Sequence, residues 1–181
     1  MVAICKKHGV WIISDEIHSD IIHKGKFVSS MDRDFSYDKI VLVSSASKTF
    51  NTPALIGSYA IFKDENLSES FNKIVKTKYF VGSASWMGIE ALMTGYNKCN
   101  YFIDDLNDYI YDNYLYMKKS LEALSNKIEV TELEATYLMW VKMDGLTDTK
   151  ILSDTFIKVG KIGIMSGENY GDDRFFRINI G

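Results

Sequence analysis

The sequence has few cysteines, no excess of basic residues and no long apolar run. Its two cysteines, Cys5 and Cys99, form neither a CxxC motif nor the spacing of a metal site, so we expect free thiols in a reducing compartment. The net charge of -3, with lysines and arginines scattered along the chain, argues against nucleic-acid binding. No apolar run reaches transmembrane length, and no signal peptide is recognised at the start. We therefore expect a cytoplasmic protein with no membrane partner.

Apolar, β-branched segments at 10–14, 39–45 and 56–62 predict three strands. The first two have the composition of strands covered on both faces, and each ends in a polar stretch, "DEIHSD" and "SSASKTF". Strands of this kind, joined by helical or irregular connections, indicate an α/β layer architecture. Ligands in such sheets bind outside the carboxyl ends of the strands, so both polar stretches are expected to line one crevice.

The remainder of the chain predicts helices, followed by a mixture of strands and helix. Residues 83–96 read as a buried helix capped by Ser85. The apolar stripe of the long helix that follows reads as a packing face, formed by Phe102, Leu106, Tyr109, Ile110, Met117, Leu121 and Leu124. The character of the pattern changes near residues 97–100, where we expect a domain boundary. Because the chain ends on a strand, we expect a piece of a longer chain. The other predicted segments are helices at 67–79, 101–124 and 149–160, two strands within 128–145, a short strand near 162–166 and a strand at 174–181.

The two polar strand exits together carry an amine, a carboxylate, an imidazole and hydroxyls. Asp15 and His18 follow the first strand, and Ser45, Ser47 and Lys48 follow the second. A pyridoxal phosphate site requires this set: a lysine for the Schiff base, a carboxylate that keeps the pyridine nitrogen protonated, and hydroxyls for the phosphate. Taken singly, each residue fits a solvated strand end or loop as well, since lysines and carboxylates are mostly exposed.

"SDEIHSD" followed by "SASKTFN" resembles the fold-type I pyridoxal-phosphate enzymes, the aspartate aminotransferase superfamily of class I/II. The residues of these two motifs are most similar to those of the branch of cystathionine β-lyase-type C–S lyases. The separation of the motifs along the chain suits one strand and its crossover connection. "RFFRINIG" resembles the strand whose arginine binds the substrate carboxylate. The resemblance covers essentially the whole chain. It implies the C-terminal half of the pyridoxal-phosphate-binding large domain at 1–97 and most of a small α+β domain, truncated, at 98–181.

The resemblance implies roles for individual residues in cofactor binding. Lys48 resembles the catalytic Schiff-base lysine, which also removes the Cα proton, and Asp15 resembles the partner of the pyridine nitrogen. His18 stands where related enzymes place a group that hydrogen-bonds the phenolic oxygen. The further contacts that the resemblance implies are Ile17 on the ring face and Ser45 and Ser47 at the phosphate.

The motif "RFFRINIG" implies a substrate-binding residue, and one position departs from the family pattern. Arg177 resembles the arginine that binds the substrate α-carboxylate bidentately, whereas Arg174 reads as a surface charge. Many family members place a phosphate-binding arginine about ten residues after the lysine, but "NTPALIGSYA" has none, and Ser58 is the nearest substitute. The family's phosphate-supporting turn and ring-stacking aromatic would lie upstream of Met1. We therefore expect a homodimeric parent enzyme and little cofactor binding by this chain alone.

Three functions follow from these observations. The favoured one is β-elimination at a C–S bond of a cystathionine-like amino acid, giving pyruvate, ammonia and a thiol. An aminotransferase shares the first steps, and nothing in the residues separates the two outcomes. In a different class, the chain could belong to a regulator that keeps an aminotransferase-like domain for sensing an effector.

Overall fold

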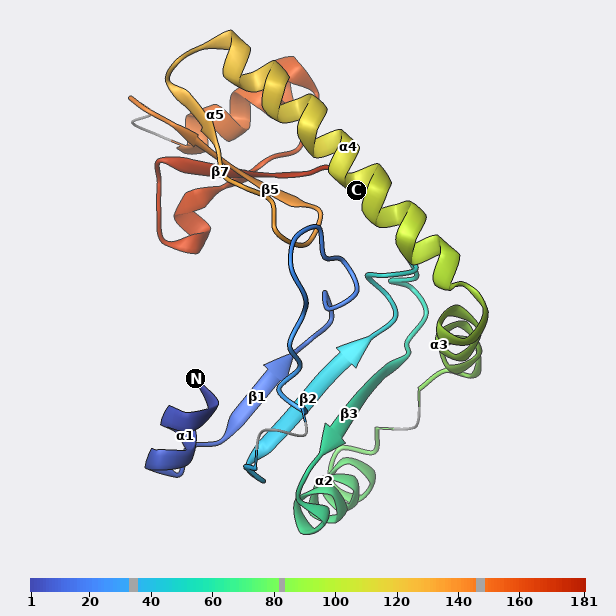
Figure 1. The fold of residues 1–181 in the computed structure, drawn as a ribbon. Helices are drawn as coiled ribbons and strands as arrows, with labels where there is room; N and C mark the ends of the chain where they lie inside the picture. The colour runs from blue at the N-terminus through green and yellow to red at the C-terminus, as the bar shows by residue number, and fades with distance from the viewer. Residues whose placement is uncertain (33–35, 82–83, 146–148) are drawn as a thin grey trace. The chain divides into compact units, whose positions relative to one another are not determined.

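A computed structural model describes residues 1–32, 36–81, 84–145 and 149–181 of the chain (Figure 1). The described chain divides into two compact units. The first unit consists of Met1–Asp20 and Lys26–Ile103, and the second of Ile21–Gly25 and Asp104–Gly181. The domain limits expected from the sequence stay a prediction.

The first unit is built on a three-stranded sheet in the order β1-β2-β3, drawn side by side in Figure 1. β1 (Ile12–Asp15) pairs in parallel with β2 (Ile40–Ser45), and β3 (Ser58–Phe62) pairs antiparallel with β2. β2 and β3 fall within the segments predicted from the sequence, and β1 overlaps its predicted segment, 10–14, but extends one residue further, to Asp15. Because β1 and β2 are parallel, the polar stretches that follow them lie at the same edge of the sheet.

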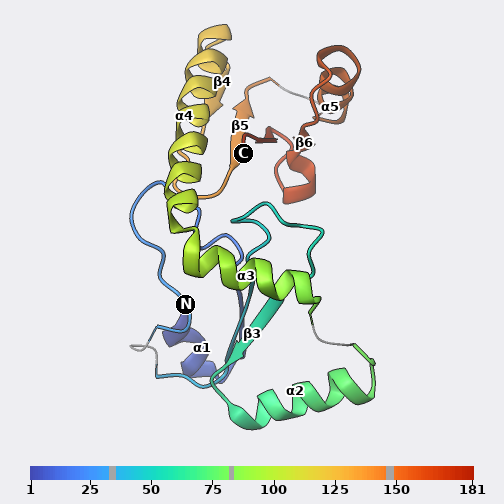
Figure 2. The ribbon, with the colours of Figure 1, turned by 90° about the vertical axis from the view of Figure 1, so that its right-hand side faces the viewer.

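The helices of the first unit begin at side-chain caps or end at a glycine. α2 is capped by the carboxylate of Asp64, and α3 is capped by Ser85, as predicted, whose hydroxyl accepts the backbone N–H of Gly88 at 3.0 Å. α1 ends at Gly9, whose φ of 65° is the left-handed conformation that glycine adopts without a steric penalty. Figure 2 shows these helices, which are α1 (Val2–His8), α2 (Glu65–Thr77) and α3 (Trp86–Lys98).

Two burial predictions for the first unit were wrong. β1 was expected to be covered on both faces, but Ile13 is 75% exposed. α3 was expected to be buried, but Trp86 is 75% exposed, and the buried residues of this helix are Gly88 and Gly95. An apolar sequence pattern indicates which face of an element can be buried. Within the described residues, no side chain covers the face of β1 that carries Ile13 or the face of α3 that carries Trp86.

The second unit contains a four-stranded antiparallel sheet in the order β4-β5-β7-β6. Its long helix, the helix after residue 148 and the closing strand all occur where the sequence predicts them. The helix α5 continues as a π-helical turn, Phe156–Gly160, and a 3-10 turn spans Gly167–Tyr170. The elements are α4 (Asn100–Leu124), β4 (Ile128–Val130), β5 (Leu138–Met143), α5 (Thr149–Thr155), β6 (Met165–Ser166) and β7 (Phe175–Asn179).

The core of the second unit lies between α4 and one face of this sheet. Ile110 and Tyr114 of α4 are buried in the same apolar cluster as Met139 and Phe176 of the sheet. The predicted packing stripe of α4 is therefore confirmed at its centre. It was wrong at Phe102, Tyr109 and Leu124, which are exposed because Tyr109 lies off the buried face and the other two lie near the helix ends. The other stripe residues packed against the cluster are Leu106, Met117 and Leu121.

Two further features bear on the class of protein. Cys5 and Cys99 are free thiols, as predicted. Within the described ranges, no helix combines the length and the apolar character that crossing a membrane requires.

Candidate active site

The turn after β1 fixes the direction of the first polar stretch. Asp15 is the last residue of β1, and one of its carboxylate oxygens accepts the backbone N–H of Ile17 at 3.1 Å. This local bond shapes the turn that carries Ile17 and His18, both of which are partly buried. The carboxylate of Asp15 itself stays exposed at the sheet edge.

The neighbouring carboxylate, Glu16, is a structural anchor. It is 6% exposed and accepts hydrogen bonds from the hydroxyls of Ser14, Ser29 and Ser30 at 2.8–3.0 Å and from the backbone N–H of Ser30 at 2.8 Å. Burial alone would raise the pKa of Glu16, but these bonds outweigh burial and hold the pKa below its ordinary value. Glu16 therefore ties the segment around Ser29 to the end of β1.

The turn after β2 carries the second polar stretch. The buried hydroxyl of Ser45 donates to the carbonyl of Gly57 at 3.0 Å and accepts the backbone N–H of Ser47 at 3.1 Å. It therefore joins this turn to the segment that enters β3, where Ser58 lies opposite Ser45. Lys48 follows on the turn with its side chain exposed.

Electrostatic interactions connect the two polar stretches. Burial and then the positive charge of Lys48 lower the pKa of His18, while the negative charge of Asp15 opposes this shift. The imidazole of His18 therefore lies within electrostatic reach of both the amine of Lys48 and the carboxylate of Asp15, as the sequence predicted for strands that end at one edge. With its pKa lowered, His18 is neutral at neutral pH.

These residues fit a pyridoxal phosphate in their chemistry. An exposed primary amine, a carboxylate and a neutral imidazole gather at the carboxyl edge of a parallel strand pair, where α/β proteins bind ligands. The hydroxyl of Ser45 is occupied by contacts within the protein, so its role at a phosphate stays a prediction, as does that of Ser47.

A polar cluster that begins at the residue after Lys48 was not predicted from the sequence. Thr49 is fully buried, and its hydroxyl donates to Oδ2 of Asp20 at 2.7 Å. The phenol of Tyr96 on α3 donates to the same oxygen at 2.7 Å. Burial, together with the hydrogen bond to Asp20 and its charge, raises the pKa of Tyr96 above its usual range. Asp20 and Thr49 lie within the two motifs, which was the available signal.

Arg177 lies on β7 of the second unit. Its Nη2 donates to Sδ of Met165 at 2.7 Å, and its guanidinium carbon lies 4.6 Å from the ring centroid of Tyr170. Within the part of the chain that the structure describes, no carboxylate pairs with Arg177. A guanidinium offers five donors, so Arg177 retains N–H groups besides the one bonded to Met165 that suit a carboxylate.

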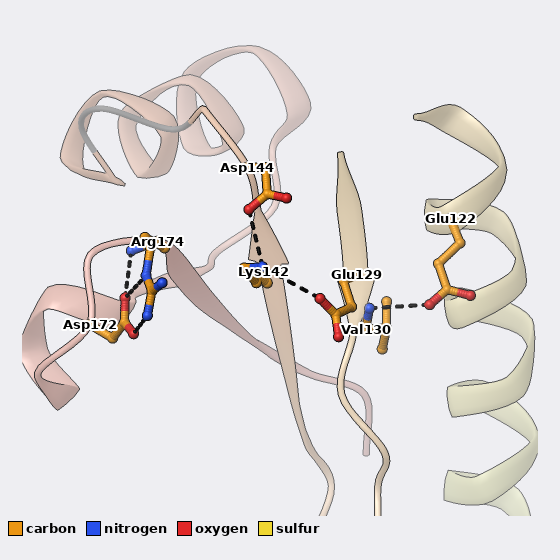
Figure 3. A network of polar contacts seen from close by, with 7 residues as sticks. All are labelled: Glu122, Glu129, Val130, Lys142, Asp144, Asp172 and Arg174. Atoms are coloured by element: carbon orange, nitrogen blue, oxygen red, sulfur yellow. Dashed lines mark hydrogen bonds and ion pairs between the residues drawn. The ribbon is translucent and has the colours of Figure 1, made fainter. Parts of the chain in front are cut away.

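Arg174 has the opposite environment, shown in Figure 3. It is exposed, and its Nε and Nη2 donate to the two carboxylate oxygens of Asp172 at 2.9 and 2.6 Å. These bonds lower the pKa of Asp172 to about 2. Arg174 is therefore a surface charge, as predicted. Figure 3 also shows Lys142 between Glu129 and Asp144, a further surface network of this sheet.

The family model for aminotransferases of class I and II matches residues 1–181. The chain belongs to this family. Among curated members, it is 30% identical over 184 residues to protein MalY of Escherichia coli (strain K12), a match that covers 100% of this chain and 47% of MalY. It is 31% identical over 185 residues to cystathionine beta-lyase PatB of Bacillus subtilis (strain 168), covering 98% of this chain and 47% of PatB.

A solved structure of the family has the same fold. The C-S lyase from Staphylococcus hominis, whose structure is pyridoxal phosphate-bound, matches with a TM-score of 0.86 and 30% identity over 98% of this chain and 47% of that chain. The predicted family, its C–S lyase branch and the α/β fold class of a fold-type I transferase are confirmed. The chain spans about half the length of these relatives.

Proposed function

We propose that the protein is a pyridoxal-phosphate-dependent enzyme acting on amino acids, and that its reaction is β-elimination at a C–S bond, giving pyruvate, ammonia and a thiol. The observation that carries this proposal is the parallel pairing of β1 and β2, which brings Asp15, His18 and Lys48 to one sheet edge. The names of the relatives, a cystathionine beta-lyase and a C-S lyase, favour elimination.

The cofactor is pyridoxal 5′-phosphate, which when bound accepts the electrons left at the substrate Cα. Lys48 would hold the cofactor through its primary amine and would accept the substrate Cα proton at Nζ. Asp15 keeps a proton at the pyridine nitrogen by its negative charge. His18, neutral because of its lowered pKa, donates a hydrogen bond to the phenolic oxygen.

The remaining contacts are proposed from their positions. Ile17 packs on the ring face, directed by the turn that Asp15 closes. Ser45 and Ser47 contribute to the phosphate site through the turn that their hydrogen bond forms. Arg177 binds the substrate α-carboxylate, because its guanidinium lacks a carboxylate partner among the described residues and its planar fork matches that group.

The larger assembly is also a proposal. We infer that residues 1–97 belong to the cofactor-binding large domain and 98–181 to the small domain. The protein acts as a cytoplasmic homodimer on small amino-acid substrates, without a nucleic-acid or membrane partner. Sedimentation of the protein with its cofactor tests the dimer.

The proposed β-elimination needs no keto-acid acceptor, whereas transamination does. The full-length parent protein, supplied with pyridoxal phosphate and L-cystathionine, is expected to release pyruvate and thiol in equal amounts with no added keto acid. Coupled reduction of pyruvate and a thiol reagent measure both products. Turnover that requires a keto-acid acceptor would contradict elimination and establish the aminotransferase, which the name of the family favours.

A further inference from the structure

The residue directly after Lys48 is fixed by a shared acceptor. Thr49 is 0% exposed, and its hydroxyl and the phenol of Tyr96 both donate to Oδ2 of Asp20. Thr49 lies on the lysine turn, Asp20 ends the stretch after β1, and Tyr96 lies on α3. One carboxylate oxygen therefore joins three separate segments of the first unit.

The next residue, Phe50, is held from the same helix. Its ring lies edge-on to Tyr96, with centroids 5.4 Å apart. A Cβ built on Gly95 would come within 2.6 Å of Cε2 of Phe50, so this glycine allows the ring to reach the helix. The backbone on the C-terminal side of Lys48 is thus bound at two consecutive residues, while the side chain of Lys48 itself is exposed.

We propose that Asp20 is a positioning residue for Lys48: by accepting hydrogen bonds from Thr49 and Tyr96, it fixes the turn that carries the amine against α3. This inference rests on the proposed function of Lys48. An exposed lysine side chain has many conformations, and a rigid backbone beneath it reduces the number of amine positions that the protein must sample. A carboxylate suits this task because bonds to a charged acceptor are stronger than neutral ones.

The first experiment measures amide hydrogen exchange at residues 47–51 in the protein without cofactor. Asp20→Asn and Thr49→Val are each expected to speed this exchange about tenfold or more, the effect of losing a hydrogen bond to a charged group. Thr49→Ser keeps the donor and is expected to stay close to the wild type. Thr77→Val removes an exposed hydroxyl bonded to the carbonyl of Lys73 and is the matched control, with no change at the turn.

Exchange elsewhere separates local loosening from general unfolding. The strands β5 and β7 of the second unit are expected to exchange at the wild-type rate in Thr49→Val. If Asp20→Asn fails to fold, the comparison of Thr49→Val with Thr49→Ser decides the question. Unchanged exchange at the turn in Thr49→Val, or equal exchange in both Thr49 variants, would overturn the inference.

The second experiment uses the full-length parent protein with pyridoxal phosphate, because little cofactor binding is expected of this chain alone. The rate at which borohydride traps a covalent adduct on Lys48 is expected to fall about tenfold in Asp20→Asn, and kcat is expected to fall more than KM rises. A wild type that forms no adduct refutes the proposed function. In that case the hydrogen-exchange result still tests whether Asp20 fixes the turn that carries Lys48. An adduct that forms equally fast in the wild type and in Asp20→Asn refutes the positioning role alone.

Discussion

Lys48 combines an exposed amine with a buried neighbour, Thr49, and this contrast decides how its substitution acts. In the full-length parent protein, Lys48→Ala is expected to abolish the covalent adduct and the visible absorbance that pyridoxal phosphate gives with the wild type. The free energy of unfolding should change by no more than about 0.5 kcal/mol, because an exposed side chain is lost. Mass spectrometry after borohydride reduction checks the adduct.

The control for this prediction is Lys26→Ala, which removes another exposed lysine of the same unit. It should keep the adduct. An adduct that persists in Lys48→Ala would mean that another amine holds the cofactor.

The two arginines near the end of the chain form a matched pair. Arg177→Lys is expected to raise KM for the amino-acid substrate about tenfold or more, since lysine cannot donate two parallel bonds to a carboxylate. Arg174→Lys should leave KM within about twofold, because Arg174 is paired with Asp172 at the surface. Steady-state kinetics measures both. Equal effects of the two substitutions would refute the carboxylate-binding role of Arg177.

Glu16 makes the free energy of unfolding depend on pH. Its folded pKa is lowered from 4.5, so the unfolded state binds its proton first and the contribution of Glu16 to stability is lost as the pH falls below that value. Glu16→Gln should lower the free energy of unfolding at neutral pH by about 1–3 kcal/mol. This difference should shrink in acid, as urea denaturation at several pH values will show. If the difference in unfolding free energy between the wild type and Glu16→Gln did not change with pH, the stabilising role of the ionised Glu16 carboxylate would be refuted.

At the scale of elements, the contact of α3 with the start of β3 is made backbone to backbone. A Cβ on Gly88 would lie 2.2 Å from the carbonyl oxygen of Ile56, and backbone there cannot move aside alone. Gly88→Ala is therefore expected to lower the free energy of unfolding by about 1–3 kcal/mol. Thermal denaturation measures the change.

The control is Gly163→Ala, because a Cβ on Gly163 meets nothing within 4 Å. It should leave the melting temperature close to that of the wild type. A Gly88→Ala protein as stable as this control would show that α3 can shift without cost.

The limits of the elements were predictable because local signals encode them. The β-branched run before Ser45 and the cap at Ser85 each specify an end of an element. The motifs also predicted that the stretches carrying Asp15 and Lys48 end at the same edge of the sheet, since β1 and β2 are parallel. What could not be predicted is the meeting of Asp20 with Tyr96. That contact depends on how α3 lies on its unit, and helical periodicity does not specify which residue of a face meets which partner.

At the scale of the whole molecule, the first sheet has an open apolar face. Ile13 is 75% exposed and Ile40 is 0% exposed, although both are isoleucines of adjacent strands. Ile13→Lys is expected to change the free energy of unfolding by no more than about 0.5 kcal/mol and to reduce self-association. Ile40→Lys should unfold the protein, because it buries an unpaired charge.

Light scattering and chemical denaturation of both variants provide the test. A loss of stability in Ile13→Lys that matches that of Ile40→Lys would mean that the face is covered in solution, by a second copy or by further chain.

The parallel register of β1 and β2 also determines when the candidate site can form during folding. Ile12 pairs with Ile40, so the chain must close a long loop before β1 gains its partner, β2. Non-local pairings of this kind slow folding. Because the two polar stretches come to one edge only through that pairing, the unfolded chain offers no formed site for a ligand. Bound pyridoxal phosphate is therefore expected to slow the unfolding rate while leaving the folding rate unchanged.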